Sequence, residues 1–487
     1  MSTEPFPVDP NLPHLKIAGD PELMREVFQR HLRPLGGSDY QVRECRIFHV
    51  RYLRSLRCLL QYDLRLAEVG TGRERSQWVT GTMFEGDRAR QISEYLRRSG
   101  PGRGIPGASP PLLAPLRWIR GKPWQSEPER EISDASQALF EPFSYIPELK
   151  MLVQVFPYDH RLPALPLLME GPPPEIEPLL LERFGPGDWR VQAWDVEPLK
   201  YLAELRATFR LTAQARDAAT GRAEERSFYA KVYYDEEVGE QTYQVLRALW
   251  DKAGAGGARF TGGKTVAYLG SLRILVQEEA SGTPLGEVLF REDEAVPAVR
   301  KVARALAALH LGRVVAPLRR YPLQKEVALL QRRGELLRLA CPHLGSEIEE
   351  TVGVVIAGLE EVPPAPTHCD LKLEHVLLDG DDLTLLDFDM FAGADPILDV
   401  ASVLARIISM PLSSSLPHER SQRLARAFAE EYFAHAPKAW RARLPFHYAG
   451  AVLRVASGIF SVRMPGWPDK VEVLLGEAKD SLEGRVW

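Results

Sequence analysis

The chain contains the same stretch of sequence twice, and this repeat restricts its architecture more than any other feature. Asp39–Arg73 aligns without gaps on Asp188–Arg222, a shift of 149 residues, and nine of the 35 positions are identical. Farther along, Tyr145–Gln154 matches Tyr268–Gln277 with five identities in ten positions. Matching blocks in the same order indicate a duplicated segment, because chance similarity between strands would not preserve their order.

A third pair of segments lies between these blocks and shows where the copies differ in length. Trp78–Gly86 lies against Phe228–Glu236 at an offset of 150, and this alignment places Gly81 opposite Lys231. The offset then falls to 123, so 150 − 123 gives the first copy about 27 additional residues. Most of them are predicted in and around Ser99–Pro115, a Gly/Pro-rich surface loop.

Each copy is predicted to contain an opening helix, two strands joined by a Thr-Gly-Arg turn, a third strand, a helix and a strand that ends in Val-Gln. The opening helices are Glu22–Leu32 and Glu175–Phe184. After Ala280, apolar residues recur at spacings of three and four, which is typical of amphipathic helices, and one such helix ends near His310. The rest of the chain is predicted to be helical apart from one hairpin.

Composition excludes several classes of protein. The 487 residues suggest about three folding units. Lys and Arg number 61 against 66 Asp and Glu, a net charge of −5, which argues against binding nucleic acid or a membrane through bulk charge. No apolar run approaches the length of a membrane span, and the N-terminus lacks the pattern of a secretory signal. Four cysteines without a CxxC pair predict reduced thiols in a cytoplasmic protein.

The hairpin carries the chemistry. It lies within THCDLKLEHVLLDGDDLTLLDFD, which runs from Thr367 to Asp389. The predicted strands are His375–Leu378 and Leu383–Asp387, so Asp370 and His375 lie on the loop before the first strand and Asp387 ends the second. A tight hairpin brings these residues to one edge. Two carboxylates and an imidazole there can hold a divalent cation and leave one carboxylate for a substrate.

These residues resemble a known family. His368–His375 resembles the HGDxxxxN catalytic loop of the aminoglycoside phosphotransferase/choline kinase-like family, and Leu386–Asp389 resembles its IDFD metal-binding segment. Asp395–Asp399 resembles the DPxxD motif that follows, with Asp395 as N-cap and Pro396 at the first helical position. The resemblance covers roughly Gly185 to the C-terminus.

The resemblance implies an α+β, bilobal, protein-kinase-like fold. A small antiparallel-sheet N-lobe, present twice here, would precede a mostly helical C-lobe. The implied activity is transfer of the γ-phosphoryl group of a nucleoside triphosphate to a small molecule. The residue division that follows is an N-terminal tail (1–20), a duplicated lobe that lacks the phosphate lysine (21–170), a working N-lobe (171–280) and the C-lobe (281–487).

The family's functional residues carry over position by position. Asp370 would be the catalytic carboxylate that accepts or orients the proton of the attacking hydroxyl. Asp387 would bind Mg²⁺, and His375 stands where the family has Asn, as a second metal ligand. Imidazole suits softer metals than Mg²⁺, so His375 could bind through water, favour Mn²⁺, or have no metal role. Lys372 is predicted to be an exposed loop lysine rather than a phosphate ligand.

The nucleotide site would lie on the second copy. Lys231, in an apolar strand, would bind phosphates, and Glu240 is preferred to Glu237 as its helix partner. Lys200–Arg206 stands in place of a Gly-rich loop, and its lack of glycine weakens the prediction of nucleotide binding. Predicted hinge residues, whose backbone would hold the adenine of ATP, are Gln277, Glu278, Glu279 and Ala280.

The leading hypothesis is an ATP-dependent phosphotransferase that acts on a hydroxyl of a sugar-like molecule. The alternative is a pseudokinase or scaffold whose first lobe binds a partner. The segment 418–487 holds 11 Lys and Arg against 8 Asp and Glu, a balance of +3, which favours a neutral or anionic acceptor over a polycationic antibiotic. The first copy could cap the active site, mediate a homodimer or help to select the acceptor.

Overall fold

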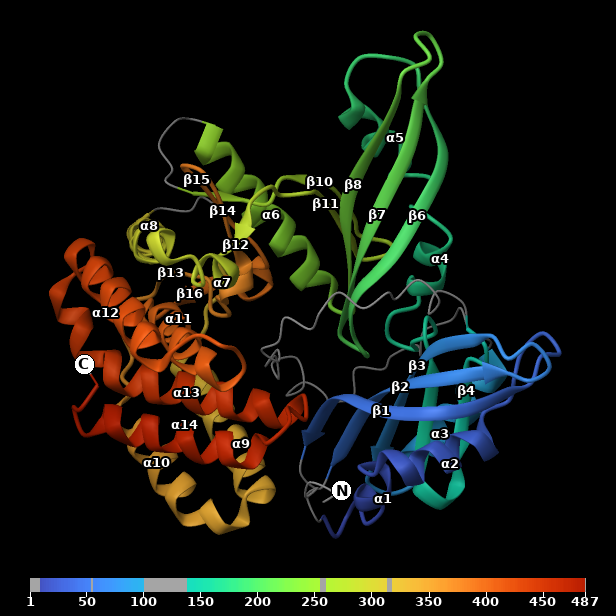
Figure 1. Ribbon diagram of the computed structural model, residues 1–487, viewed down its shortest axis with the longest axis horizontal. Helices are drawn as coiled ribbons and strands as arrows, with labels where there is room; N and C mark the ends of the chain where they lie inside the picture. The colour runs from blue at the N-terminus through green and yellow to red at the C-terminus, as the bar shows by residue number, and fades with distance from the viewer. Residues whose placement is uncertain (1–8, 54–55, 100–137, 255–259, 313–317, 487) are drawn as a thin grey trace.

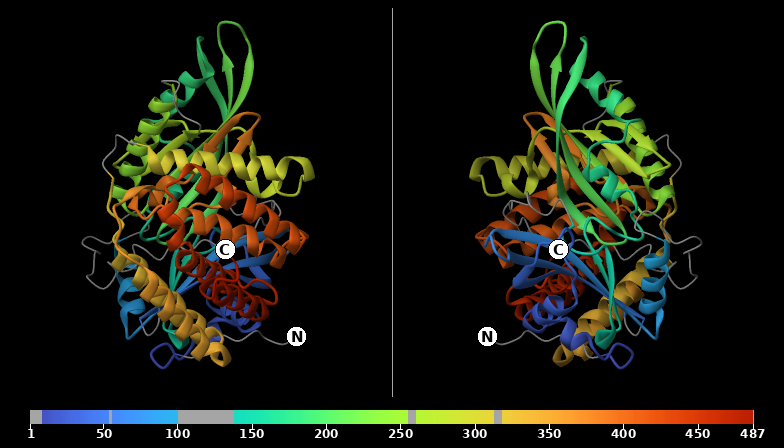
Figure 2. Two further views of the ribbon diagram at one scale, coloured as in Figure 1. Left: turned by 90° about the vertical axis from the view of Figure 1, so that its left-hand side faces the viewer. Right: turned by 90° about the vertical axis from the view of Figure 1, so that its right-hand side faces the viewer.

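The computed structural model describes residues 9–53, 56–99, 138–254, 260–312 and 318–486. Two small lobes, each built on a five-stranded antiparallel sheet, lie on one side of the molecule, and a helical C-lobe lies on the other (Figure 1). Strands β6–β8 of the second lobe extend past the rest of the molecule at one end (Figure 2). Apart from Ser99, the predicted loop Ser99–Pro115 lies outside the described residues.

The first lobe is a sheet with the strand order β1-β2-β3-β5-β4 and helices packed against it. Its core gathers apolar side chains from α2, β1, β2, β3 and β5. The predicted opening helix is present, and the sheet contains a fourth strand that the sequence pattern did not indicate. The elements are α1 (Leu15–Ala18), α2 (Pro21–His31), β1 (Tyr40–Leu53), β2 (Arg57–Glu68), β3 (Glu74–Phe84), α3 (Arg88–Ser99), β4 (Phe143–Ile146) and β5 (Met151–Val155).

The second lobe has the equivalent strand order, β6-β7-β8-β11-β10. Its long helix follows the third strand, as α3 does in the first lobe. The elements are α4 (Leu165–Met169), α5 (Glu177–Leu181), β6 (Trp189–Leu202), β7 (Arg206–Asp217), β8 (Ala223–Tyr233), α6 (Glu236–Gly254), β9 (Thr261–Gly262), β10 (Thr265–Leu269) and β11 (Ile274–Glu278).

The two sheets also share their register. Tyr40 pairs with Glu68, and Trp189, 149 residues later, pairs with Asp217. The first register shift lies between Val42 and Glu44 in one sheet and between Val191 and Ala193 in the other. The fourth and fifth strands are joined by a turn that ends at a left-handed residue, Lys150 (φ 48°) or Arg273 (φ 57°). Their common origin by duplication stays an inference from this likeness.

The register corrects one alignment made from sequence. Leu59 pairs with Thr82, and its counterpart Thr208 pairs with Lys231, so Thr82 and not Gly81 stands at the lysine position. A one-residue error moves a side chain to the opposite face of a sheet. A Cβ on Gly81 would meet Met151 in the core of the first lobe, whereas Thr82 faces the second lobe. The first lobe still lacks the lysine.

Two similar turns set boundaries that differ from the predicted division. Asp9 accepts the phenol proton of Tyr52 at 2.6 Å, and Asp159 accepts that of Tyr201 at 2.9 Å. Residues 9–20, predicted as a tail, contribute Leu12, Leu15 and Ala18 to the first core. Residues 159–170, assigned from sequence to the first lobe, instead pack against the second sheet through Leu162, Leu165 and Leu168. Short apolar turns of this kind carry too little periodicity to be assigned to either lobe from sequence.

The C-lobe is helical, with short strands beneath the second lobe. The predicted hairpin is present, but Asp379 pairs with Asp382, so its turn has only two residues. Strands β12, β14, β15 and β9 form one sheet, and β13 pairs with β16. The elements are β12 (Thr283–Pro284), α7 (Leu285–Val288), α8 (Glu292–Leu311), α9 (Leu323–Ala340), α10 (Gly345–Gly358), β13 (Ala365–Thr367), β14 (Val376–Asp379), β15 (Asp382–Leu385), β16 (Ala392–Ala394), α11 (Ile397–Ser409), α12 (His418–His435), α13 (Leu444–Ser461) and α14 (Trp467–Leu482).

A buried ion pair joins the two small lobes. Glu204, at the turn between β6 and β7, has a left-handed backbone (φ 64°) and forms an ion pair with Arg57 of the first lobe. Arg51 and Arg161 lie 3.9 and 4.0 Å from the same carboxylate. Burial alone would raise the pKa of Glu204, but the surrounding arginines hold it well below its usual range. A left-handed glutamate is unfavourable by itself, so these contacts hold the turn in place.

The first lobe also packs on the C-lobe. Leu336 and Leu339 of α9 lie against the apolar core of the first lobe, and β1 contacts α13. The first lobe therefore packs against both the second lobe and the C-lobe.

We expect Glu204→Gln to lower the free energy of unfolding by about 3–5 kcal/mol at pH 7, because three buried arginines would lose their carboxylate. The contribution of Glu204 is present above its unfolded pKa and is lost as the pH falls toward its depressed folded pKa. The difference between wild type and variant should therefore shrink in acid. Urea unfolding of both proteins from pH 7 to pH 3 measures this difference in the free energy of unfolding. The control is Glu225→Gln, at an exposed position. Equal stability of the two variants at pH 7 would contradict this account.

Candidate active site

The loop that carries Asp370 is held by a buried carboxylate on α11. Asp399 accepts hydrogen bonds from the backbone N–H of His368 at 2.6 Å and of Cys369 at 2.8 Å. Cys369, at the glycine position of the HGD pattern, has φ 63°. The two hydrogen bonds fix this left-handed residue, and His310 contacts the same carboxylate at 3.1 Å. The DPxxD segment thus shapes the loop.

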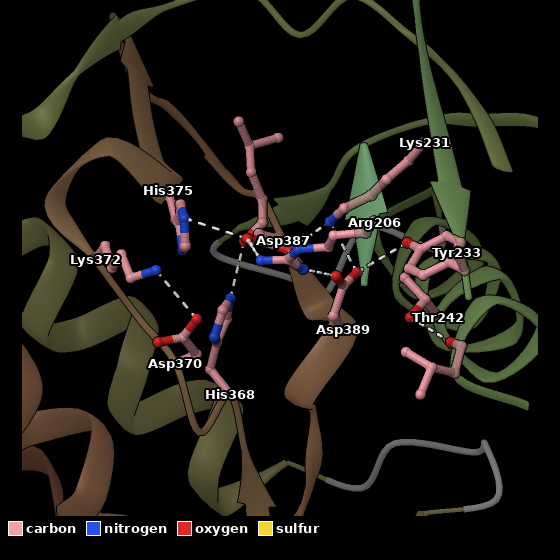
Figure 3. Close-up of polar contacts among 12 residues, drawn as sticks. Arg206, Lys231, Tyr233, Thr242, His368, Asp370, Lys372, His375, Asp387 and Asp389 are labelled. Carbon is pink, nitrogen blue, oxygen red and sulfur yellow. Dashed lines mark hydrogen bonds and ion pairs between the residues drawn. The ribbon is translucent and has the colours of Figure 1, made fainter. Parts of the chain in front are cut away.

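Asp370 is paired with Lys372. The Lys372 Nζ lies 3.1 Å from Asp370 Oδ2, and both side chains are buried (Figure 3). The prediction of an exposed loop lysine is wrong, because Lys372 is 0% exposed. A fully buried lysine beside a carboxylate neutralises that carboxylate and fixes its orientation.

The two predicted metal ligands lie together. Asp387 follows β15 with a left-handed backbone (φ 63°), just before the 3-10 turn Phe388–Met390, and so does not end the strand as predicted. His375 Nε2 is 3.4 Å from Asp387 Oδ2. His368 Nε2 contacts the Leu386 carbonyl at 2.9 Å, which connects this segment to the loop that carries Asp370. Within the described ranges, no three His, Cys, Asp or Glu side chains group as a metal site.

Lys231 reaches across from the second lobe. It lies on β8, the central strand of its sheet, so it is not an edge-strand lysine that points its amine to solvent. Its Nζ is 2.5 Å from Asp387 Oδ1 and 2.8 Å from Asp389 Oδ1 (Figure 3). Residues 156 and 158 positions apart in the sequence therefore meet in one ion-pair cluster.

The carboxylates that pair with Lys231 come from the C-lobe, whereas the predicted partner was a glutamate of α6. Glu240 is exposed and contacts Gln244, and Glu237 forms an ion pair with Arg319 at 3.5 Å. The carboxylates that pair with Lys231 are those of Asp387 and Asp389. The acidic residues of the C-lobe compete better because they are buried beside the lysine, whereas Glu240 faces water.

Arg206 is a second cation that the sequence analysis left without a definite role. It follows the turn that carries Glu204, lies 3.2 Å from Asp387 Oδ1, and also forms an ion pair with Asp389. Tyr233 donates its hydroxyl hydrogen to Asp389 at 2.8 Å. The sequence did contain an indication that Arg206 matters, because it is identical in both copies and corresponds to Arg57.

The predicted hinge lies at the end of β11. Gln277 and Glu278 are its last two residues, and Glu278 pairs with Lys264 at 2.7 Å. Tyr229 donates a hydrogen bond to Glu279 at 3.2 Å. Just beyond Ala280, Gly282 has φ 121°, and a Cβ there would lie 2.9 Å from the Leu378 carbonyl oxygen, so only glycine fits where the chain enters the C-lobe. The adenine-binding role of these residues remains a prediction.

Comparison with known families agrees with this geometry. Residues 195–446, more than half of the chain, match the sequence model of the family described as "Phosphotransferase enzyme family". The match defines an enzyme that transfers phosphoryl groups, as predicted. The chain belongs to the phosphotransferase enzyme family, and the predicted α+β bilobal fold is confirmed. The match begins within β6, so the first lobe lies outside the matched residues.

Several solved structures are similar to the chain at low sequence identity. A choline/ethanolamine kinase family protein from Mesorhizobium loti is 15% identical over 59% of this chain and 88% of that chain (TM-score 0.38). A Plasmodium vivax ethanolamine kinase is 12% identical over 59% and 83% (TM-score 0.39). An ADP-bound aminoglycoside phosphotransferase is 14% identical over 63% and 99% (TM-score 0.39). No curated protein matches the chain.

The cluster that joins the second lobe to the C-lobe should be sensitive to a single lost charge. We expect Asp389→Asn to destabilise the protein by about 3 kcal/mol, because two buried cations would then share the one carboxylate of Asp387. The matched control is Asp381→Asn in the exposed hairpin turn, which should leave the midpoint of urea unfolding nearly unchanged. A midpoint for Asp389→Asn that equals the control would show that the cluster does not stabilise the lobe arrangement.

Proposed function

We propose that the protein transfers the γ-phosphoryl group of ATP to a hydroxyl of a small, sugar-like molecule. The observation that carries the proposal is the meeting of Lys231 with Asp387, beside the loop that holds Asp370. A phosphate-binding cation, a metal-binding carboxylate and a catalytic carboxylate are the groups that kinase-type phosphoryl transfer needs. A scaffold would have no use for all three in one place.

Lys231 and Arg206 would bind the phosphates. Both are buried cations whose partners here are Asp387 and Asp389, and phosphate oxygens are an alternative anionic partner with suitable geometry for a guanidinium. Asp387 would hold Mg²⁺ together with His375, and His375 would favour Mn²⁺ if it binds directly. When bound, the ion would neutralise charge on the phosphates.

Asp370 would receive the hydroxyl proton. Lys372 keeps the carboxylate in one orientation at 3.1 Å, and the hydrogen bonds that the loop backbone donates to Asp399 keep the loop rigid. A fixed carboxylate can align the hydroxyl for attack on the γ-phosphorus. Lys372 is close enough to the catalytic carboxylate to lower the negative charge that the triphosphate meets there.

Replacement of Asp370 tests the catalytic role. Asp370→Asn should lower kcat for release of nucleoside diphosphate by about 10²–10⁴-fold, because the hydroxyl loses its proton acceptor. The ATP-induced thermal shift should persist. Asp379→Asn, an exposed carboxylate in the same hairpin, is the control. A panel of sugars, amino alcohols and aminoglycosides supplies acceptors, and activity of Asp370→Asn within a few-fold of wild type would reject the assignment.

A second measurement separates enzyme from scaffold and identifies the working lobe. ATP with Mg²⁺ or Mn²⁺ should raise the melting temperature of the wild type, and Lys231→Met should abolish that shift, because ligand binding stabilises the folded state. The matched change in the other lobe is Thr82→Val, at the equivalent register position, and it should leave the shift intact. No shift of the wild type with any nucleotide–metal pair would favour a scaffold.

A further inference from the structure

We propose that the acceptor carries an oxyanion, a carboxylate or a phosphate, which Arg333 and Arg406 bind beside the catalytic loop. This inference rests on the proposed function and names the chemical class of its acceptor. It follows from two buried guanidinium groups for which the described part of the chain offers no ionic partner.

Arg406 lies on the face of α11 that holds the catalytic loop. Asp399 on this helix binds the loop backbone, and Ser402, three residues on, donates a hydrogen bond to the Leu371 carbonyl at 2.9 Å. Arg406 is four residues beyond Ser402, so it lies on the same helical face. It is 4% exposed, and its Nε has no hydrogen-bond partner. No ion pair joins its guanidinium to a described residue.

Arg333 approaches the same loop from α9. Leu329, four residues earlier on the same side of this helix, packs in one apolar cluster with Cys369 of the loop. Arg333 is 9% exposed, and its Nη1 is buried without a hydrogen-bond partner. Arg454 of α13 lies near both arginines, but its guanidinium forms an ion pair with Glu326 at 2.6 Å. Glu326 also accepts a hydrogen bond from Tyr321. Burial and the neighbouring Arg454 lower the pKa of Arg333 to about 10. Asp370 is within electrostatic range of all three arginines.

The charge balance around Asp370 is positive. Three carboxylates lie in this region, those of Asp370, Glu326 and the exposed Glu374. The cations are four: Lys372, Arg333, Arg406 and Arg454. A buried charge without a partner is costly, and a fold retains one only where something compensates for it. Guanidinium groups match carboxylate and phosphate oxygens in a bidentate geometry. An anionic group on the acceptor would supply the missing charge.

The position of the first lobe fits this assignment. Leu336, three residues after Arg333 and on the same side of α9, packs against the first lobe. The first lobe therefore borders the region in which the acceptor would bind. A polycationic acceptor would meet unpaired arginines there, and the same groups that favour an anion would exclude it.

The chemical step balances without further reactants. The acceptor hydroxyl oxygen forms a bond to the γ-phosphorus, and the bond from the γ-phosphorus to the bridging oxygen breaks, so nucleoside diphosphate leaves with the electron pair. The hydroxyl proton passes to Asp370 and then to solvent. Arg333 and Arg406 bind the distant oxyanion and take no part in bond changes.

The test measures binding of defined probes to the full-length chain by thermal shift. The probes are glucose 6-phosphate, gluconate, glucose and kanamycin, with inorganic phosphate as the minimal anion. We expect the anionic probes to raise the melting temperature at millimolar concentration, and glucose and kanamycin not to do so. Comparison of glucose 6-phosphate with gluconate distinguishes a phosphate from a carboxylate.

Variants locate the effect. Arg333→Met and Arg406→Met should weaken binding of the anionic probes at least tenfold, while the melting temperature of the free protein stays equal or rises, because an unpaired buried charge is removed. Arg406→Lys keeps the charge and should restore part of the binding. Lys231→Met should retain the shift, since the nucleotide phosphates bind elsewhere. Arg426→Met, on an exposed face of α12, is the matched control.

Other results would overturn the proposal. They are an equal shift with glucose or kanamycin, a shift that persists in both arginine variants, loss of the shift in Lys231→Met alone, or no shift with any anion. Stabilisation by inorganic phosphate only near 100 mM, matched by chloride, would mean an adventitious ion only. If anions bind as expected but no acceptor yields nucleoside diphosphate, the proposed function fails and the anion site stands. If a neutral acceptor is phosphorylated equally by wild type and both arginine variants, the function stands and this inference fails.

Discussion

The arrangement of the second lobe on the C-lobe depends on four buried charges. Lys231 and Arg206 come from one lobe and Asp387 and Asp389 from the other. The most distant pair in the sequence, Arg206 and Asp389, is 389 − 206 = 183 residues apart. Two cations and two carboxylates compensate each other where water is excluded, so each lobe supplies what the other would lack alone. The same charges define the proposed phosphate and metal positions. Lobe docking and the proposed phosphate binding therefore depend on the same residues.

The first lobe forms a similar ion pair with the second lobe. Arg57 and Arg206 begin equivalent strands, and each forms an ion pair with a carboxylate of the unit that follows it: Glu204 for the first lobe and Asp387 for the second. Thr82 at the lysine position contacts Glu204 at 3.4 Å. In the first lobe, the side chain of Glu204 thus takes the place that corresponds to the proposed phosphate position. A lobe that binds a carboxylate of its own chain at this position needs no phosphate-binding lysine.

Sequence alone predicted the parts that depend on periodicity and on short motifs. The strand pattern, the long helices and the loop from His368 to His375 were predictable because their spacing is local. The partner of Lys231 could not be predicted in this way. Glu240 and Asp389 are both carboxylates, and burial, which depends on how two lobes meet, distinguishes them. Lys372 was misjudged for the same reason, since a loop lysine looks exposed until helices cover it. The Gly81 alignment failed by one residue, which similarity cannot resolve but hydrogen-bond register can. Arg333 and Arg406 lie on unrelated helices, and nothing in the sequence connects them.

The turn at Glu204 has a mechanical consequence. Only Leu205 separates the residue held by the first lobe from Arg206, which reaches the proposed phosphate position. The first lobe also rests on α9 beside Arg333. The first lobe therefore contacts both the turn that leads to Arg206 and the helix that carries Arg333, so it connects the two proposed binding positions. A movement of the first lobe that changes both contacts would couple binding at the two proposed positions. Such a coupling is equal in both directions.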